Sequence, residues 1–327
     1  MNHCITKRSY RESRAILVSV VLFVALCVAQ PLSGVDTSST PTGTVNPKPL
    51  AQIPRPEKGT PGAGRRVAVT EPEYVGTDVH HILYLPTNYG AKKRYPLIVE
   101  YTGNYVPDGS SSGLIEDAHL GFALTLGKDF IWVVLPYIAL DHQHNERTWW
   151  GDTQATVDYA ERAIPRIIKQ YHGDRNAVIL CGFSRGAIGV SYIGLHNDKV
   201  AKLWSAFYTH DHFDGVLEWK GQSWGSPLQK YREEAAQRLH RVHGRPFWVG
   251  QMGSTNDTKN YLSEWSLLSN GNFTFEDIPM KQLFPVVPNE YFMKYHNDMW
   301  PIFDTPSGRD ARQWLRTVSR LPAVTPQ

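Results

Sequence analysis

The sequence predicts an α/β fold in which a mostly parallel central sheet is covered by helices on both faces. Three observations favour this fold. Short apolar segments recur along the chain, helical segments alternate with them, and several of the apolar segments end at a proline or a glycine. Strands that are apolar along their whole length are typical of parallel sheets buried on both faces. In such sheets, functional groups gather beyond the carboxyl ends of the strands.

The expected elements follow in chain order. Strands are predicted over residues 79–85, 95–101, 130–135, 177–181, 202–208 and 246–251, and helices over residues 152–171, 186–195, 227–242 and 307–318. The strand AVILC, over residues 177–181, is wholly apolar and is therefore expected in the middle of the sheet. The helix over residues 152–171 contains Pro165, which is expected to kink it.

The composition is that of a folded protein and not of a disordered, coiled-coil or fibrous one. The 327 residues are 41% apolar and 20% charged, and the 10 Trp and 16 Tyr supply ample apolar area for a core. Residues 1–29 hold four basic residues and one acidic residue, so the formal charge of +3 belongs to them and the rest of the chain is neutral. No nucleic-acid partner is therefore expected.

The N-terminal segment has the pattern of an export signal. A basic region from Lys7 to Arg14 precedes an apolar run from Ala15 to Ala29. This run is shorter than the ~20 residues that a membrane span needs. Residues 1–29 are therefore interpreted as a signal peptide, and the protein is expected in the periplasm or outside the cell. The alternative is an uncleaved anchor, and only then would a membrane be a partner.

Two regions are expected after the signal. Residues 30–66 are rich in Pro, Thr, Ser and Gly and are predicted to form a flexible spacer. Residues 67–327 fit one α/β domain in size. Cleavage of the signal would leave Cys181 as the sole cysteine, which excludes an intramolecular disulfide and a cysteine-rich zinc site. Nothing in the sequence indicates the oligomeric state.

Ser184 is the candidate nucleophile. It is the serine of the pattern Gly-x-Ser-x-Gly at residues 182–186, directly after the strand AVILC and directly before a predicted helix. A serine in a sharp turn between strand and helix needs small residues two positions before and after it, so that the two elements can approach each other. The same pattern surrounds Ser111, which sits in a polar loop, and Ser223, which follows a poorly apolar segment. A tight turn without chemistry is the alternative for Ser184.

The segment GFSRG, the stretch VHHILYLPTNYGAKKRYPLIVEY leading to Gly103, and a late histidine before the closing helix resemble the α/β-hydrolase superfamily over about residues 79–320. The chain looks most like secreted bacterial serine esterases. One oxyanion-hole donor is expected to be the backbone N–H of Arg185, the residue after the nucleophile. The resemblance places the second donor at Gly103 or Asn104, where this chain reads Tyr-Thr-Gly-Asn and lipases often carry His-Gly-Gly.

The order Ser, acid, His in this superfamily makes His296 the candidate general base. It lies after the stretch FTFEDIPMKQLF and before the closing helix. The acid has several candidates. Asp257, after the strand over residues 246–251, is the first choice, and Asp211 and Asp214, one strand earlier, are the alternatives. A carboxylate that is not the acid is expected to cap a helix or to form hydrogen bonds within a loop.

The expected function is that of an exported serine hydrolase. It would cleave carboxylic esters, of small molecules or of acylated carbohydrates, through an acyl-enzyme and without a cofactor. The acyl and alcohol parts of the substrate are left open by the sequence. The long segments over residues 104–121, 137–151 and 209–226 follow strands and are expected to shape the pocket.

Two alternatives belong to other functional classes. His210, His212 and Asp214 form an H-x-H-x-D run that resembles the zinc-binding run of metallo-β-lactamase-type hydrolases, although Gly215 stands where those enzymes usually carry a further histidine. A metal-dependent hydrolase would use this run. The many tryptophans, including an adjacent pair at residues 149–150, would also suit a protein that binds carbohydrate without catalysis.

Overall fold

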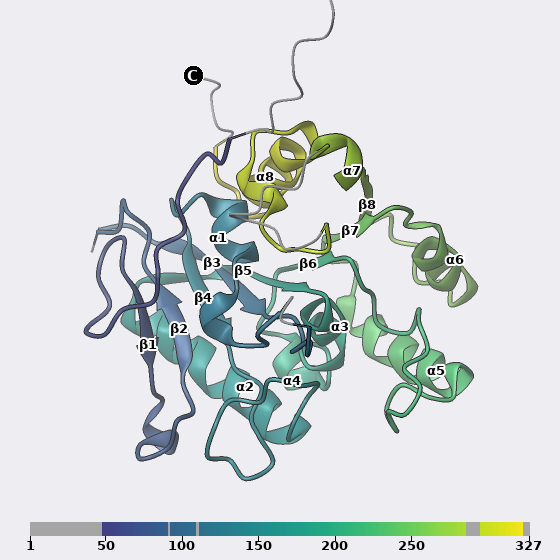
Figure 1. Ribbon diagram of the computed structural model, residues 1–327, viewed down its shortest axis with the longest axis horizontal. Coiled ribbons are helices and arrows are strands. Elements are labelled where there is room, and N and C mark those ends of the chain that lie inside the picture. Colours follow the sequence, from purple (N-terminus) through teal and green to yellow (C-terminus); the bar gives the residue numbers. More distant parts are fainter. Residues whose placement is uncertain (1–47, 91, 109–110, 286–294, 323–327) are drawn as a thin grey trace, which may run out of the picture. The chain divides into compact units, whose positions relative to one another are not determined.

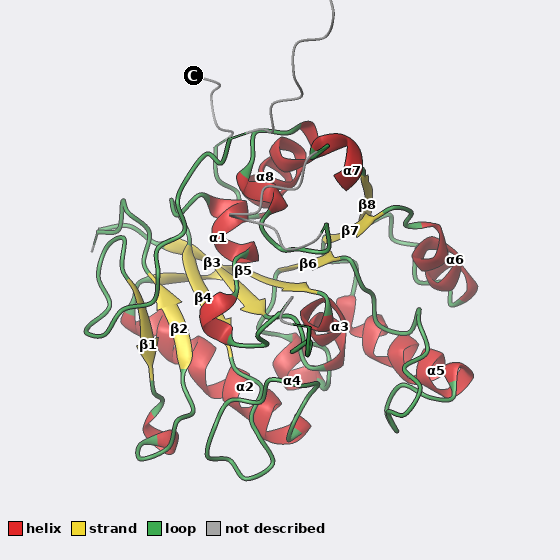
Figure 2. Ribbon diagram, in the orientation of Figure 1, coloured by secondary structure: helices red, strands yellow, loops and turns green. Residues whose placement is uncertain are grey.

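A single sheet organises the fold, and helices lie on both of its faces (Figures 1 and 2). The computed structural model describes residues 48–90, 92–108, 111–285 and 295–322. The strands in these residues are β1 (Arg66–Val69), β2 (His81–Tyr84), β3 (Tyr95–Tyr101), β4 (Ile131–Leu135), β5 (Gly173–Phe183), β6 (Ala206–His210), β7 (Phe247–Met252) and β8 (Phe273–Ile278). Their order in the sheet is β1-β2-β4-β3-β5-β6-β7-β8.

The helices connect and cover these strands. They are α1 (Leu120–Thr125), α2 (Thr153–Gln170), α3 (Arg185–Tyr192), α4 (Asp198–Ala201), α5 (Leu228–Leu239), α6 (Asn256–Glu264), α7 (Met280–Leu283) and α8 (Pro306–Val318). Single turns of 3-10 helix occur at Pro72–Tyr74, Ile115–Asp117, His240–Val242 and Trp300–Ile302. Asp152 begins α2 by accepting the N–H of Ala155, and α2 continues through Pro165.

The sheet is antiparallel at one end and parallel elsewhere. β2 pairs antiparallel with β1 and with β4, and the remaining neighbours run parallel. The register places Tyr101 of β3 opposite Gly182 of β5, and Phe183 of β5 opposite His210 of β6. The loops after β3, β5 and β6 therefore all begin at the carboxyl ends of these parallel strands, which is where the candidate site residues are found.

Two apolar cores lie on opposite faces of the sheet. Alternate residues of β3 belong to different cores, with Leu97 and Val99 in one and Ile98 in the other. The first core includes residues of α2, α3, α5 and α6, whereas the second includes residues of α1 and α8. In Figure 1, α1 and α8 lie on one side of the central strands and α2 lies on the other. The predicted fold class, a mostly parallel sheet with helices on both faces, is confirmed.

The structure differs from the predicted elements where strands are short or polar. β6 begins at Ala206 and not at residue 202, because the Asn197 side chain caps α4 and the helical turn continues to Leu203. β1 and β8 lie at the two edges of the sheet and were not among the predicted strands. β8, FTFEDI, is only half-buried over most of its length, so it lacks the continuous apolar pattern of the central strands.

Part of the expected spacer lies against the domain. The N–H of Leu50 donates to the carbonyl of Ile302 at 2.9 Å, the N–H of Glu57 donates to the carbonyl of Arg66 at 2.8 Å, and Ile53 packs against the second core. The predicted signal peptide over residues 1–29 and the spacer up to residue 47 lie outside the described residues. In the described part, no helix has the length and the hydrophobicity to cross a bilayer.

Candidate active site

Ser184 lies in a strained turn between β5 and α3. Its backbone angles are φ 55° and ψ −120°, which ordinary residues rarely adopt and which cost about 1–3 kcal/mol. A Cβ on Gly182 would lie 2.1 Å from the carbonyl oxygen of Gly186, and a Cβ on Gly186 would lie 1.8 Å from that of Tyr101. The two glycines therefore let β3, β5 and α3 approach one another, as the Gly-x-Ser-x-Gly pattern predicts.

The other serines with this pattern lack such a setting. Ser223 is exposed in the loop between β6 and α5. Ser111 lies in an irregular segment between β3 and α1, where it bridges to Val106. Neither serine lies in a turn that leads directly from a buried strand into a helix.

His296 is hydrogen-bonded to Asp211. The Nδ1–H of the imidazole donates to Oδ2 of Asp211, and Oδ1 of the same carboxylate accepts the N–H of Met252 at 3.0 Å. Asp211 directly follows β6, with φ 77°, and its own N–H donates to the carbonyl of Gly250 at 2.8 Å. The end of β7 thus fixes the carboxylate, and the carboxylate fixes one ring nitrogen of His296.

Asp257, the first choice for the acid, is not the partner of His296. It is the second residue of α6 and is exposed, and a carboxylate in the first turn of a helix interacts favourably with the helix dipole. Asp257 and Asp211 line one cavity of about 150 Å³, but only Asp211 reaches the imidazole. The physical reason is position, because Asp211 directly follows β6, the strand next to β5, whereas Asp257 lies beyond β7 on α6.

Asp214, an alternative acid, is held by a different partner. Its buried carboxylate accepts two hydrogen bonds from Arg238 of α5, from Nε at 2.9 Å and from Nη2 at 3.1 Å. A carboxylate engaged in this way faces α5. The geometry therefore assigns Asp214 to an internal ion pair and not to the imidazole of His296.

The His210–Asp214 run does not converge on one point. Its carboxylate belongs to the ion pair with Arg238, and the His210 ring is buried with its centroid 5.6 Å from that of Phe183 and 5.5 Å from that of Trp300. Within the residues that the structure describes, no group of three or more His, Cys, Asp or Glu side chains is placed to hold a metal ion. The metal-ligand interpretation of the run therefore has no geometric support.

The charges around His296 favour an ionised acid and neutral neighbours. Burial, together with the nearby charge of His296, lowers the pKa of His212 to about 4. Burial likewise lowers the pKa of His210. Burial raises the pKa of Asp211, but the hydrogen bond from His296, the adjacent His210 and the N–H of Met252 outweigh it, so the net shift is strongly downward. Asp211 is therefore a carboxylate at neutral pH, as stabilisation of an imidazolium requires.

The loop after β3 reaches Ser184. A Cβ on Gly103 would lie 3.6 Å from the Cβ of Ser184, so this loop passes directly beside the turn. The backbone N–H of Arg185 lies in the first turn of α3, where N–H groups have no partner within the helix. The side chain of Asn104 accepts the N–H of Trp149 at 2.7 Å. The expected oxyanion-hole residues are therefore neighbours of Ser184.

An array of aromatic rings extends from His296 over two of the long loops. The ring of His212 lies 5.5 Å from that of His296 and 5.4 Å from that of Trp219. Trp149 lies 4.9 Å from Trp219 and 5.0 Å from Trp224. This aromatic array joins the loop over residues 137–151 to the loop over residues 209–226.

A buried polar cluster behind the His296 loop was not predicted. Glu100 of β3 accepts two backbone N–H groups at the start of α1, at 3.1 and 2.8 Å, and the indole N–H of Trp132 at 2.8 Å. Asp298, two residues after His296, accepts the backbone N–H of His119 at 2.8 Å and contacts its Nδ1 at 3.1 Å. The available signal was a single carboxylate inside the apolar strand YPLIVEY, since a buried charge requires partners.

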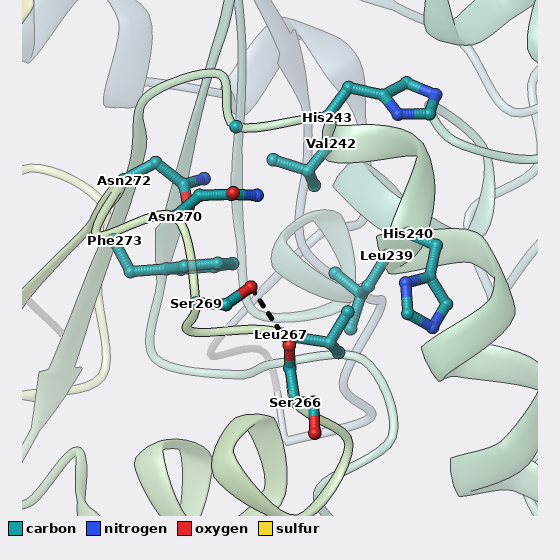
Figure 3. Close-up of a pocket in the computed structure, with 11 residues that line it drawn as sticks. Leu239, His240, Val242, His243, Ser266, Leu267, Ser269, Asn270, Asn272 and Phe273 are labelled. Carbon is teal, nitrogen blue, oxygen red and sulfur yellow. Dashed lines mark hydrogen bonds between the residues drawn. The ribbon is translucent and has the colours of Figure 1, made fainter.

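A further pocket lies at the amino ends of β7 and β8 (Figure 3). It has a volume of about 240 Å³ and is lined by residues before β7 and before β8, such as Val242 and Ser269, and by Phe273, the first residue of β8. Strands β7 and β8 begin there, whereas Ser184 and Asp211 follow the carboxyl ends of β5 and β6. The pocket is therefore separate from the candidate active site.

Three features identify the fold type. They are the strand order, the strained serine between β5 and α3, and the loop between β8 and α8 that carries His296. The chain has an α/β-hydrolase fold. No protein-family model matches the sequence, and no curated protein matches it either.

Several solved structures are similar to this chain. A thermostable esterase is 13% identical with a TM-score of 0.47, over 77% of this chain and 62% of that one. A feruloyl esterase module from Clostridium thermocellum is 16% identical with a TM-score of 0.44, over 71% of this chain and 86% of that one. An isopeptidase is 12% identical with a TM-score of 0.49, over 80% of this chain and 41% of that one. The chain thus spans less than two thirds of the thermostable esterase and of the isopeptidase.

Proposed function

We propose that this α/β-hydrolase is a serine hydrolase that cleaves carboxylic esters through an acyl-enzyme. The observation that supports this proposal is that Ser184 and the His296–Asp211 pair lie close together at the carboxyl ends of β5 and β6. The N–H of Ser184 donates to the carbonyl of His210 at 3.0 Å, and Asp211 is the next residue after His210. The ring of Phe183, which precedes Ser184, lies 4.6 Å from that of His296.

In the proposed reaction, Oγ of Ser184 attacks the carbonyl carbon of the ester. Because Nδ1 of His296 is engaged by Asp211, Nε2 takes the serine proton and later returns it to the leaving alcohol. The N–H of Arg185 and the Gly103–Asn104 loop stabilise the oxyanion. Water then attacks the acyl-enzyme, which releases the acid and restores Ser184. None of these steps requires a cofactor.

A serine-directed probe tests this proposal. A fluorophosphonate should label the wild-type protein at Ser184 alone, and Ser184→Ala should lose both the labelling and the hydrolysis of p-nitrophenyl acetate while its melting temperature is unchanged. Ser223→Ala is the matched control, because it changes a serine of the same pattern on an exposed loop. It should behave as the wild type. Persistent labelling or hydrolysis in Ser184→Ala would contradict the proposal.

We further propose that the substrate contains a ring, as an acylated carbohydrate does. The aromatic array from His212 to Trp224 supports this, since aromatic side chains present large apolar faces with polar edges to ring-shaped ligands. A panel of acetyl, feruloyl and long-chain p-nitrophenyl esters, together with an acetylated oligosaccharide, tests it. We expect the highest kcat/KM with the feruloyl ester or the oligosaccharide. A preference for the long-chain ester would contradict it.

Export is also part of the proposal and depends on the basic and apolar pattern of residues 1–29. N-terminal sequencing of the protein recovered from the producing cells tests it. A mature protein that begins near residue 30 supports cleavage, whereas an intact N-terminus in the membrane fraction supports the anchor.

A further inference from the structure

The side chain of Arg185 connects the turn at Ser184 to the loop over residues 137–151. Its backbone N–H is the expected first oxyanion donor, but its guanidinium extends elsewhere and is almost fully buried. Nη1 donates to the carbonyl of Trp149 at 2.9 Å, and the guanidinium carbon lies 4.1 Å from the centre of the Tyr137 ring. One residue thus contacts both the turn and the loop over residues 137–151.

Trp149 is held on both sides of its backbone. Its carbonyl accepts from Arg185, and its N–H donates to the side-chain oxygen of Asn104 at 2.7 Å. Trp149 has φ 53°, an unfavourable value for a bulky residue, which persists only where surrounding contacts enforce it. A continuous chain of hydrogen bonds therefore runs from the Arg185 side chain through Trp149 to Asn104.

A second contact ties the same two loops together. The N–H of Tyr105 donates to the carbonyl of Arg147 at 2.9 Å, so residues 104 and 105 are both fastened to residues 147–149. The Gly103–Asn104 loop is thus positioned by the segment that Arg185 holds. This loop carries the expected second oxyanion donor.

The burial of Arg185 is unfavourable for stability alone. Nε and Nη2 have no hydrogen-bond partner among the described residues, and burial lowers the pKa of the guanidinium to about 10, so it is still charged at neutral pH. A buried charge with few partners reduces stability, and a buried apolar side chain of similar volume is often as good or better. A buried and partly unpaired guanidinium such as that of Arg185 is therefore better explained by a functional role than by a contribution to stability.

We propose that the Arg185 side chain is a positioning residue for the oxyanion hole, which sets the distance between its own backbone N–H and the Gly103–Asn104 loop by way of Trp149. This inference rests on the proposed function and extends it from the backbone of Arg185 to its side chain. Donors of an oxyanion hole act only at about 2.7–3.1 Å from the developing charge, and loss of one donor reduces kcat by about 10²–10³. A small displacement of the loop should therefore reduce kcat and leave KM unchanged.

The test compares Arg185→Met and Arg185→Lys with a matched control. Arg245→Met changes another guanidinium that lies over an aromatic ring, 4.9 Å from Phe207, and donates to backbone carbonyls, including that of Trp204 at 2.8 Å. Burial also lowers the pKa of Arg245 to about 10. Arg245 lies before the amino end of β7, whereas Ser184 follows the carboxyl end of β5. The measurements are kcat and KM for a p-nitrophenyl ester, the Ki of a trifluoromethyl ketone that forms a tetrahedral adduct with serine, and the melting temperature.

We expect Arg185→Met to lower kcat by about 10- to 100-fold, to raise the Ki by the same factor and to change KM less than about twofold. Arg185→Lys should lie between it and the wild type. Arg245→Met should lower the melting temperature with kcat and Ki unchanged. If Arg185→Met behaves as Arg245→Met does, the side chain is merely structural and the inference is wrong.

A second variant keeps the test decisive if Arg185→Met fails to fold. Asn104→Ala removes the other end of the chain of hydrogen bonds and should show the same parallel change in kcat and Ki. Combined with Arg185→Lys, its effect should be less than the product of the two separate effects, because both act on Trp149. Multiplicative effects would overturn the inference. Failure of the proposed function is distinguishable, since wild-type Ser184 would then not react with the fluorophosphonate.

Discussion

The imidazole of His296 is hydrogen-bonded to Asp211, which directly follows β6. β6 lies beside β5, the strand that carries Ser184 at its end. Asp211 and Ser184 therefore follow neighbouring strands, and His296 lies in the loop between β8 and α8. Met252, the last residue of β7, donates its backbone N–H to Asp211, whereas Asp257 lies further along the chain on α6 and does not contact His296.

Asp211→Asn should reduce kcat by up to about 10⁴-fold, because an amide would hold the imidazole in the wrong tautomer. Asp257→Asn should leave kcat within about threefold of the wild type, since an exposed carboxylate in the first turn of a helix contributes only ~0.3–1 kcal/mol of stability. Steady-state kinetics on one ester and thermal unfolding of both variants provide the comparison. A large loss of kcat in Asp257→Asn with little loss in Asp211→Asn would restore Asp257 as the acid.

Asp214→Asn should lower the stability of the protein and leave kcat nearly unchanged. The carboxylate is buried and forms two hydrogen bonds with Arg238, and removal of one partner of a buried ion pair costs about 3–5 kcal/mol. Denaturant unfolding should show this loss, while kcat at a temperature well below the melting point stays near that of the wild type. Asp198→Asn, which changes an exposed partner of Arg241, is the control and should leave stability nearly unchanged. A selective loss of kcat in Asp214→Asn would point to a role in the site.

The central strands could be predicted from the sequence because they are buried on both faces. β3 has the predicted bounds, and the turn at Ser184 follows from a wholly apolar strand, two glycines and a helix. The edge strands could not be predicted in this way, because one side of β8 is open to solvent and its polar residues interrupt the apolar pattern. The start of β6 was placed too early because Trp204 is buried without being part of a strand.

The candidate acid could not be decided from the sequence, because the loops after β6 and β7 both carry aspartates. Only the spatial path of each loop separates them. Asp211 turns back with a positive φ to face His296, whereas Asp214 turns towards Arg238. The contacts of the Arg185 side chain were equally hidden, because Trp149 and Asn104 lie far from it in the sequence and pair through a backbone group.

Gly186→Ala should prevent the turn at Ser184 from forming. A Cβ at this position would lie 1.8 Å from the carbonyl oxygen of Tyr101 and 3.1 Å from that of Thr102, so the backbone after β3 would have to move. We expect a loss of at least about 3 kcal/mol in the free energy of unfolding, or failure to fold. Gly90→Ala is the control, because a Cβ at Gly90 would meet no atom within 4 Å. Equal stability of the two variants would mean that α3 does not pack against β3 as described.

The buried carboxylate of Glu100 should make stability fall as the pH rises. Burial and the charge of Asp298 raise its pKa to about 7, against the opposing effects of the N–H of Gly121, the indole of Trp132 and the charge of His119. Between pH ~4.5 and ~7, the folded protein therefore holds a proton on Glu100 that the unfolded chain has released. The folded state binds more protons in this window, so the free energy of unfolding decreases with increasing pH.

Glu100→Gln should remove this part of the pH dependence, because an amide does not titrate. Denaturant unfolding of the wild type and of Glu100→Gln at several pH values from 4.5 to 7 should give a smaller decline in the variant. The pKa of His119 is raised, because the charge and the hydrogen bond of Asp298 outweigh its burial, so His119 also lowers stability as the pH rises, and only the difference between the two proteins reports on Glu100. Asp277→Asn is the control, since the hydrogen bonds from Thr255 lower the pKa of Asp277 and place its titration below this window. A decline in Glu100→Gln as steep as in the wild type would show that Glu100 is ionised in the folded protein throughout this range.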